Sequence, residues 1–210
     1  MAWRLLMRRC PSRSMTVVGD VAQTGELAGT SSWAAVLAPY VADRWRLAEL
    51  TVNYRTPAEI MDLAAAVLAG IDPDLKPPRS VRSTGVPPEL AAVAPGRLPE
   101  RLIEVATARA DEVGEGRVGV LVPAGALAEL GRAVSQALPD AAVGDSVELE
   151  SRVVVLTVRQ AKGLEFDAVV VADPEAIVAE SPRGRSDLYV ALTRPTQRLT
   201  VLHTSPTWAP

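Results

Sequence analysis

Two arginines could do chemistry, because each ends a short patterned segment. Arg55 closes Asn53-Tyr54-Arg55, and Arg194 follows apolar residues spaced to bury one face of a helix. An arginine grips a phosphate through a planar fork of N–H donors that lysine cannot match. Pro195 ends regular structure beside Arg194 and would aim its guanidinium. Taken alone, each pattern also fits a plain alternative: a core tyrosine beside a solvated arginine, or an amphipathic helix with a surface arginine.

Two further segments carry polar groups after β-branched runs. The segment 157–166 (TVRQAKGLEF) contains Gly163, which allows close backbone approach, and Glu165, which could accept hydrogen bonds from a ribose. Phe166, the only phenylalanine, would anchor this loop in the core. The segment 19–23 (GDVAQ) places Asp20 and Gln23 after a short strand. Alone, the segment 19–23 would be an ordinary turn after a strand. The ten patterned residues of 157–166 are harder to dismiss as an ordinary loop.

The elements that must position these residues alternate along the chain. Apolar, β-branched runs predict strands, and a 3.6-residue apolar period predicts helices. Ser, Thr and Pro residues give helix starts, with Thr30, Ser31 or Ser32 capping one helix and Thr56-Pro57-Ala58-Glu59 opening another. The proline-rich stretch 72–99 predicts a long loop with one or two short edge strands. The predicted strands are 16–18, 47–52, 118–122, 152–158, 168–171 and 199–202; the predicted helices are 3–9, 33–41, 56–69, 99–113, 124–138 and 187–193.

This alternation predicts an α/β fold, a parallel sheet with helices on both faces. Ligands in such folds bind beyond the carboxyl ends of the strands, so we expect the candidate residues there. The 210 residues fit one domain, or one domain and a remnant of another.

Composition excludes several classes of function. Cys10 is the only cysteine and His203 the only histidine, which excludes an internal disulfide and leaves almost nothing for histidine or zinc chemistry. We therefore expect no bound metal. The net charge of −3 gives no global field for nucleic acid, so any such contact must be local. No apolar run approaches the ~20 residues of a membrane span. We expect a cytoplasmic monomer without membrane contact.

Taken in order, the four segments resemble motifs III, IV, V and VI of superfamily 1 helicases of the UvrD/Rep group. QAKGLEF and YVALTR are the specific parts of the resemblance. In that family ATP lies between two RecA-like domains of the P-loop NTPase fold. The resemblance implies that residues 1–46 are the end of the first domain. Residues 47–210 would then be the second RecA-like domain, which has no Walker A loop of its own.

The resemblance also implies catalytic roles for three residues. Arg55 and Arg194 would be arginine fingers on the γ-phosphate of ATP, and Gln23 would sense that phosphate. Phosphoryl transfer needs charge stabilisation more than covalent chemistry, so one finger can contribute ~10³–10⁵ in rate. Because the fingers would lie on the second domain, catalysis would require domain closure.

Further contacts to ATP and nucleic acid follow from the same resemblance. Tyr54 would stack on adenine, Gly163 would approach the phosphates through its backbone, and Glu165 would bind the ribose. Thr157 and Arg159 occupy the positions of the family's nucleic-acid contact, where UvrD-type motif V has T-x-H. The missing histidine puts unwinding in doubt.

The branch that the chain most resembles is the HelD-like group of RNA polymerase recycling ATPases. RRCPSRSMTVVGD, DRWRLAELTVNYRTPAEI and LYVALTRPTQRL carry this likeness. About a hundred residues separate Arg55 from Gln160, too few for the large inserted subdomain of typical UvrD-type enzymes. The partners would be the N-terminal motor half of the same protein, and DNA or RNA polymerase. A UvrD/Rep-type DNA helicase is the alternative, and a non-catalytic interaction domain is a second one, which retention of both arginines disfavours.

The sequence lacks the segment with which such a motor binds the phosphates of ATP. There is no G-x-x-x-x-G-K-[ST], and the two lysines, Lys76 and Lys162, lie in other contexts. ATP would bind with Mg²⁺, whose ligands would lie outside this chain, and we expect the chain to be a fragment that alone neither hydrolyses ATP nor binds it tightly. His203, Arg79 and Arg82 are interpreted as surface or packing residues.

Overall fold

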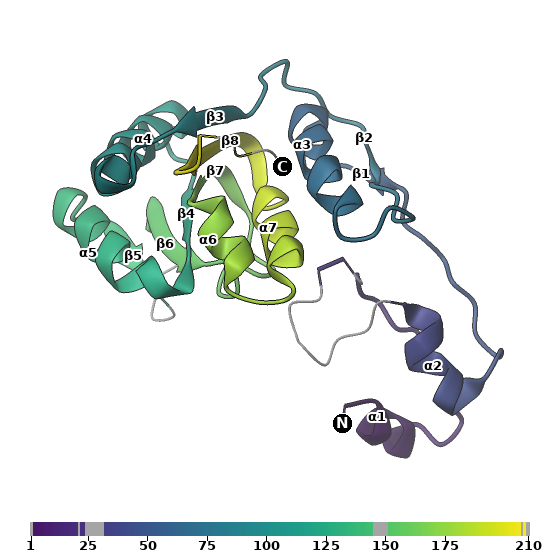
Figure 1. Cartoon of the computed structure of the whole chain (residues 1–210). Coiled ribbons are helices and arrows are strands. Elements are labelled where there is room, and N and C mark those ends of the chain that lie inside the picture. The colour runs from purple at the N-terminus through teal and green to yellow at the C-terminus, as the bar shows by residue number, and fades with distance from the viewer. Residues whose placement is uncertain (1, 21, 24–31, 145–150, 207, 209–210) are drawn as a thin grey trace.

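A six-stranded parallel sheet forms the centre of the computed structural model, which describes residues 2–20, 22–23, 32–144, 151–206 and 208 (Figure 1). All five strand pairs of this sheet are parallel, so the predicted sheet is confirmed. The strands in spatial order are β3 (Glu89–Ala92), β8 (Pro195–His203), β7 (Phe166–Ala172), β4 (Val118–Val122), β6 (Val153–Thr157) and β5 (Ala141–Val143). A separate pair joins β1 (Val52–Asn53) to β2 (Arg79–Ser80).

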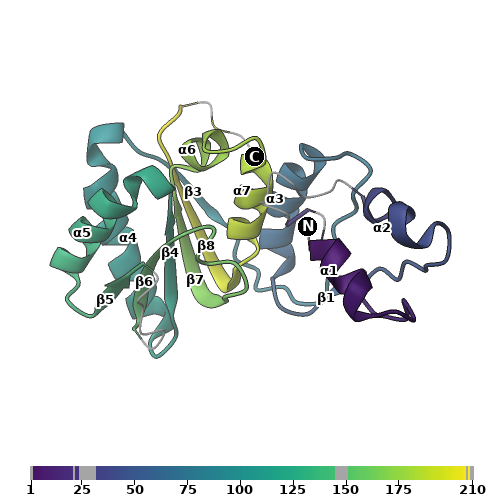
Figure 2. The same ribbon diagram turned by 90° about the horizontal axis from the view of Figure 1, so that it is seen from below.

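Helices cover both faces of the sheet, as the sequence predicts (Figure 2). One face carries α3 (Ala58–Ala69), α6 (Pro174–Ala179) and α7 (Gly184–Leu192). The other face carries α4 (Leu98–Val113) and α5 (Leu127–Ala137), with the short 3₁₀ turns Pro95–Arg97 and Ala124–Ala126 preceding them. Side chains of β6 alternate between the faces, with Val154 packing on the α7 side and Val155 on the α4 side. Burial on both faces explains why the central strands are almost uniformly apolar.

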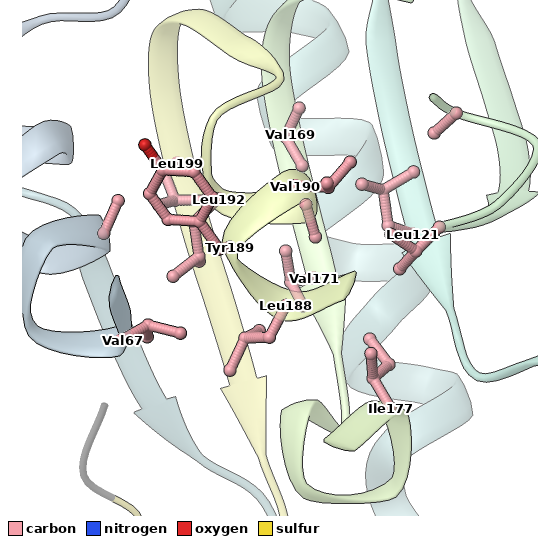
Figure 3. Packing of buried hydrophobic residues seen from close by; sticks show 14 of the residues in the cluster. Val67, Leu121, Val169, Val171, Ile177, Leu188, Tyr189, Val190, Leu192 and Leu199 are labelled. Carbon is pink, nitrogen blue, oxygen red and sulfur yellow. The ribbon is translucent and has the colours of Figure 1, made fainter. Parts of the chain in front are cut away.

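Helix α7 is buried on nearly all sides, because it lies between the sheet and α3 (Figure 3). Leu188 and Leu192 pack in the same core as Val67 of α3 and Val169 of β7. Full burial of a leucine side chain stabilises the fold by about 1.5–3 kcal/mol. This packing fixes where α7 ends and therefore where Arg194 lies.

The N-terminal helices lie apart from the sheet in both views (Figures 1 and 2). They are α1 (Ala2–Arg9) and α2 (Trp33–Val41), and both were predicted. Ser32 caps α2, since its Oγ accepts a hydrogen bond from the Ala35 backbone N–H at 3.2 Å. The other cap candidates, Thr30 and Ser31, lie outside the described residues.

Two predicted strands are wrong. Residues 16–18 form no strand, and of 47–52 only Val52 does. Val18 is 87% exposed and Leu50 88% exposed. A strand needs a neighbour to satisfy its backbone N–H and C=O groups, and the described chain offers residues 16–18 and 47–50 none.

The predicted N-cap of α3 is also wrong. Thr56 is buried and does not cap; Pro57 holds the cap position without a side-chain bond. Glu59 instead binds the loop that follows β2, accepting from Ser83 Oγ at 2.5 Å and from the Gly85 N–H at 2.7 Å. The bond from Ser83 is the main reason that the pKa of Glu59 falls to about 2.

Two elements were not predicted, β5 and α6. β5 has only three residues, and α6 only six. Asp173 starts α6 from a left-handed backbone conformation and accepts a hydrogen bond from the Ala176 N–H at 3.3 Å. Short elements such as these carry too few residues to show a period.

Gly184 tests the packing that positions α7. A Cβ at this position would meet the Val178 carbonyl of the preceding helix, whereas a Cβ at Gly96 would meet open space. Helix propensity alone would favour alanine at a helical position by about 1 kcal/mol. We expect the opposite for Gly184→Ala, a loss of about 1–3 kcal/mol in the free energy of unfolding. Urea denaturation of this variant beside the control Gly96→Ala measures it; equal stabilities would contradict the packing.

Candidate functional site

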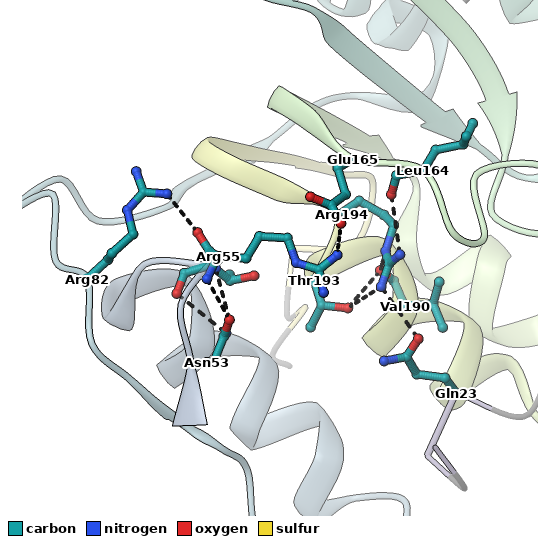
Figure 4. Close-up of polar contacts among 10 residues, drawn as sticks. Gln23, Asn53, Arg55, Arg82, Leu164, Glu165, Val190, Thr193 and Arg194 are labelled. Atoms are coloured by element: carbon teal, nitrogen blue, oxygen red, sulfur yellow. Dashed lines mark hydrogen bonds and ion pairs between the residues drawn. The ribbon is translucent and has the colours of Figure 1, made fainter. Parts of the chain in front are cut away.

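Four segments that are distant in sequence meet near the amino ends of β7 and β8 (Figure 4). Arg55 comes from the turn after β1, and Glu165 from the residue before β7. Arg194 comes from the residue before β8, and Gln23 from the N-terminal region. The structure therefore brings all three predicted catalytic residues together with one predicted nucleotide contact.

Arg194 is the buried member of this cluster, with only 4% of its surface exposed. Its Nε donates to the Val190 carbonyl at 3.1 Å, and its Nη1 donates to the Leu164 carbonyl at 3.3 Å. Its Nη2 donates to Thr193 Oγ1 at 3.3 Å and to Gln23 Oε1 at 3.4 Å. Each guanidinium nitrogen thus has a protein partner, which fixes the orientation of the side chain.

The pKa of Arg194 depends on burial and on the charges around it. Burial is the main cause that lowers the pKa of Arg194, and the nearby Arg55 charge lowers it further. Glu165, Tyr189 and Asp20 act in the opposite sense. Arginine is effectively always protonated in proteins, so two cationic groups face each other beside one carboxylate. An anion at this place would relieve the repulsion.

A rigid turn holds Arg55. Asn53 Oδ1 accepts hydrogen bonds from the Arg55 N–H at 2.9 Å and the Thr56 N–H at 3.2 Å. Arg82 Nη1 donates to the Arg55 carbonyl at 3.0 Å. Arg82 is exposed, as expected of a surface residue, and its head group also supports this turn. Neither supporting role was recognised from the sequence; the Asn two residues before Arg55 is the available signal, since Asx turns use this spacing.

The Arg55 side chain forms an ion pair with Glu165 Oε1. The two side chains are 43% and 47% exposed, so water and salt screen the pair. Such a pair contributes about 0–1 kcal/mol to stability. Its consequence is orientation, because it turns Arg55 toward Glu165 and Arg194 (Figure 4).

Asp20 shapes the turn that presents Gln23. Its Oδ1 accepts from the Ala22 N–H at 2.9 Å, and its Oδ2 accepts from Gln23 Nε2 at 2.9 Å. The amide nitrogen of Gln23 is thereby engaged, and its Oε1 is directed at Arg194. The signal in the sequence was the glycine-aspartate pair before Gln23.

The remaining predicted residues lie around or away from the cluster. Tyr54 is 72% exposed beside Arg55, free to present its ring to solvent. Gly163 has φ of +87°, a conformation that favours glycine, and is exposed two residues before Glu165. Thr157 and Arg159 are not part of the cluster: they lie at the carboxyl end of β6, where Gln160 Oε1 accepts from Thr157 Oγ1 at 3.0 Å.

The expectation that the site lies at the carboxyl edge of the sheet is wrong for the cluster. Glu165 and Arg194 each precede a strand, so they lie at the amino edge. Residues 158–165 pass from the end of β6 to the start of β7 without an intervening helix, and α7 returns the chain to the start of β8. Of the predicted nucleic-acid contacts, Thr157 and Arg159 do follow the carboxyl end of β6.

The group set suits an anionic, hydroxyl-bearing ligand. Two guanidiniums can bind phosphate oxygens, and the glutamate can accept from hydroxyl groups. Within the described ranges no group of three or more His, Cys, Asp or Glu side chains could hold a metal ion. A pocket of about 370 Å³ lies elsewhere, lined by residues such as Pro123 and Asp173 at the carboxyl ends of β4 and β7.

Comparison with known proteins identifies part of the chain. Residues 152–202 match the model of the UvrD-like helicase C-terminal domain, a range that includes Glu165 and Arg194. The segments at 19–23 and 53–55 lie outside the match. None of the described helices has the length and apolarity to cross a membrane.

Three solved structures resemble the chain to different degrees. The C-terminal domain of a possible DNA helicase from Lactobacillus plantarum WCFS1 matches with a TM-score of 0.53 and 20% identity, over 73% of this chain and 91% of that one. The Sulfolobus solfataricus SWI2/SNF2 ATPase core in complex with dsDNA gives 0.45 and 16%, over 77% and 35%. Arterivirus nonstructural protein 10 (helicase) with DNA gives 0.32 and 17%, over 73% and 25%. No curated protein matches the sequence.

The ionisation of Tyr189 tests the environment beside Arg194. Burial, with a smaller effect of Asp20, raises the pKa of Tyr189 to about 12. The neutral phenol is favoured in the folded state, so its contribution to stability is present below pH 10.0 and is lost as pH rises toward about 12. The tyrosinate absorbance of wild type minus Tyr189→Phe should titrate near pH 12. A difference curve centred near pH 10 would place this ring in solvent.

Proposed function

We propose that this chain supplies the second motor domain of a UvrD-type, ATP-dependent nucleic-acid motor. The observation that carries the proposal is the convergence of Arg55 and Arg194 beside Glu165 at one edge of the sheet. The match of residues 152–202 to the UvrD-like helicase C-terminal domain supports it independently.

Arg55 and Arg194 would act as arginine fingers on the γ-phosphate of ATP. Charge builds on the transferred group and its neighbours during phosphoryl transfer, and two preorganised guanidiniums would stabilise it. Gln23 would report the presence of that phosphate, because its Oε1 already contacts Arg194. A γ-phosphate that draws Arg194 away would release this contact.

The nucleotide would also contact the surrounding residues. Glu165 would exchange Arg55 for a ribose hydroxyl, Tyr54 would stack its exposed ring on adenine, and the Gly163 backbone would approach the phosphates. ATP would carry Mg²⁺, with the metal ligands supplied by the first motor domain.

A first motor domain would have to complete the site. The 210 residues contain no G-x-x-x-x-G-K-[ST], so the loop that cradles the phosphates would come from that domain. We assign residues 1–46 to its end and 47–210 to the second domain. Support comes from the extended residues around Val18, which pair with no strand of the described sheet. Hydrolysis would then require the two domains to close.

Within this class we favour an RNA polymerase remodelling ATPase of the HelD-like type over a DNA helicase. Between α3 and β6, every described strand and helix except β2, which pairs with β1, belongs to the six-stranded sheet and its layers, and the described residues form no separate inserted subdomain. Arg159 stands where UvrD-type motors have histidine, which weakens the case for strand unwinding.

Substitution of the fingers tests the motor. In a motor assembled from this chain and the first domain, Arg194→Ala and Arg55→Ala should each lower kcat for ATP by about 10³-fold, the lower range for an arginine finger. Arg132→Ala, an exposed arginine on α5, is the control and should leave kcat unchanged. The isolated chain should not hydrolyse ATP. Turnover by the isolated chain that is lost with Arg194→Ala would refute the need for the first motor domain. Full activity of Arg194→Ala in the assembled motor would refute the role of Arg194 as an arginine finger.

The partner can be tested with the same assembled motor. We expect it to be retained by immobilised RNA polymerase and to leave a forked DNA duplex intact in the presence of ATP. Unwinding of the fork without retention by polymerase would favour the UvrD/Rep-type helicase. If the motor is not retained by polymerase, does not unwind the fork and does not turn over ATP, a non-catalytic domain would be favoured.

A further inference from the structure

We propose that Lys162 is a positioning residue that holds Gln23 against Arg194, and that it links the nucleic-acid edge of the sheet to the nucleotide cluster. The inference deepens the proposed function and rests on it. It assigns a role to one of the two lysines of the chain.

The contact itself is direct. Lys162 Nζ donates a hydrogen bond to the Gln23 carbonyl at 2.7 Å, across 139 positions of sequence. A hydrogen bond from an ammonium group is charge-assisted and short, which matches this distance. The main chain of Gln23 is thereby attached to the segment that ends in Glu165.

Two bonds then fix the side chain of Gln23. Asp20 Oδ2 accepts from its Nε2, and its Oε1 accepts from Arg194 Nη2. Of these three hydrogen bonds, only the one from Lys162 holds the backbone of Gln23. It therefore sets the distance between the turn that carries Gln23 and the rest of the domain. Without it, Gln23 would keep its bond to Asp20 and move with the turn away from Arg194.

The place of Lys162 in its own segment explains the link. Its N–H donates to the Arg159 carbonyl at 3.4 Å, and the Ala161 N–H donates to the Thr157 carbonyl at 3.0 Å. Ala161 is fully buried, which ties this turn to the core. Lys162 therefore lies between the proposed nucleic-acid contacts at 157 and 159 and the proposed ribose contact at 165. A shift at Arg159 on binding nucleic acid would move Lys162 and, through it, Gln23.

The contact can be tested on the 210-residue chain with an amine-reactive label and mass spectrometry. Lys76 is exposed in the proline-rich loop and serves as the internal control. Lys162 should react about fivefold more slowly than Lys76, the factor that corresponds to one hydrogen bond of ordinary net strength. Asp20→Ala, which loosens the turn, should bring the two rates together. Equal rates in the wild-type chain would overturn the contact.

The coupling role needs the assembled motor. Lys162→Met should lower kcat about tenfold and change KM for ATP less than about twofold, because the contacts proposed for ATP binding are intact while Gln23 is misplaced. Lys162→Arg should restore most of kcat, since it keeps a donor, and Lys76→Met is the matched control. An unchanged kcat in Lys162→Met, with Arg194→Ala inactive, would overturn this inference and leave the proposed function standing. Activity retained in Arg194→Ala would instead refute the proposed function.

Discussion

Two cationic guanidiniums held side by side are the constraint on which the rest of the structure depends. Arg194 is buried, and the positive charge of the nearby Arg55 repels it and lowers its pKa. Such an arrangement is favoured where the nitrogens of the buried guanidinium have acceptors and a carboxylate lies near. The carbonyls of Val190 and Leu164, Thr193 Oγ1 and Gln23 Oε1 accept from Arg194, and Glu165 pairs with Arg55. Their positions follow from α7 packing between the sheet and α3.

The same constraint explains how a nucleotide would change the molecule. In the structure described, Glu165 neutralises Arg55, and the donors of Arg194 are directed at protein acceptors. A phosphate would compete for both guanidiniums and free Glu165 for another partner. Binding would therefore rearrange contacts between segments, rather than fill an empty space. This exchange connects three parts of the chain that are distant in sequence.

Much of the fold could be predicted from the sequence, because its strands are apolar runs covered on both faces. The run 118–122 and the period of 99–113 are local signals and needed no tertiary information. The segments 16–18 and 47–52 carry equally good local signals, yet a strand forms only where a neighbour exists. Local pattern also located Arg55, Glu165 and Arg194. It did not show which edge of the sheet they share, because residues 158–165 reach the amino end of β7 without a helix. The roles of Asn53 and Arg82 depend on contacts across the turn, which no local pattern contains.

A charge-swap cycle between positions 55 and 165 tests the central claim most directly, on the chain alone. Arg55→Glu places two carboxylates together, and Glu165→Arg places three guanidiniums together, so each should lower the free energy of unfolding. The double variant restores an opposite pair. We expect it to be more stable than the sum of the single effects by about 1 kcal/mol, a coupling that adjacent charges give. Effects that add within about 0.3 kcal/mol would show that the charges at positions 55 and 165 are not coupled, and would contradict the account.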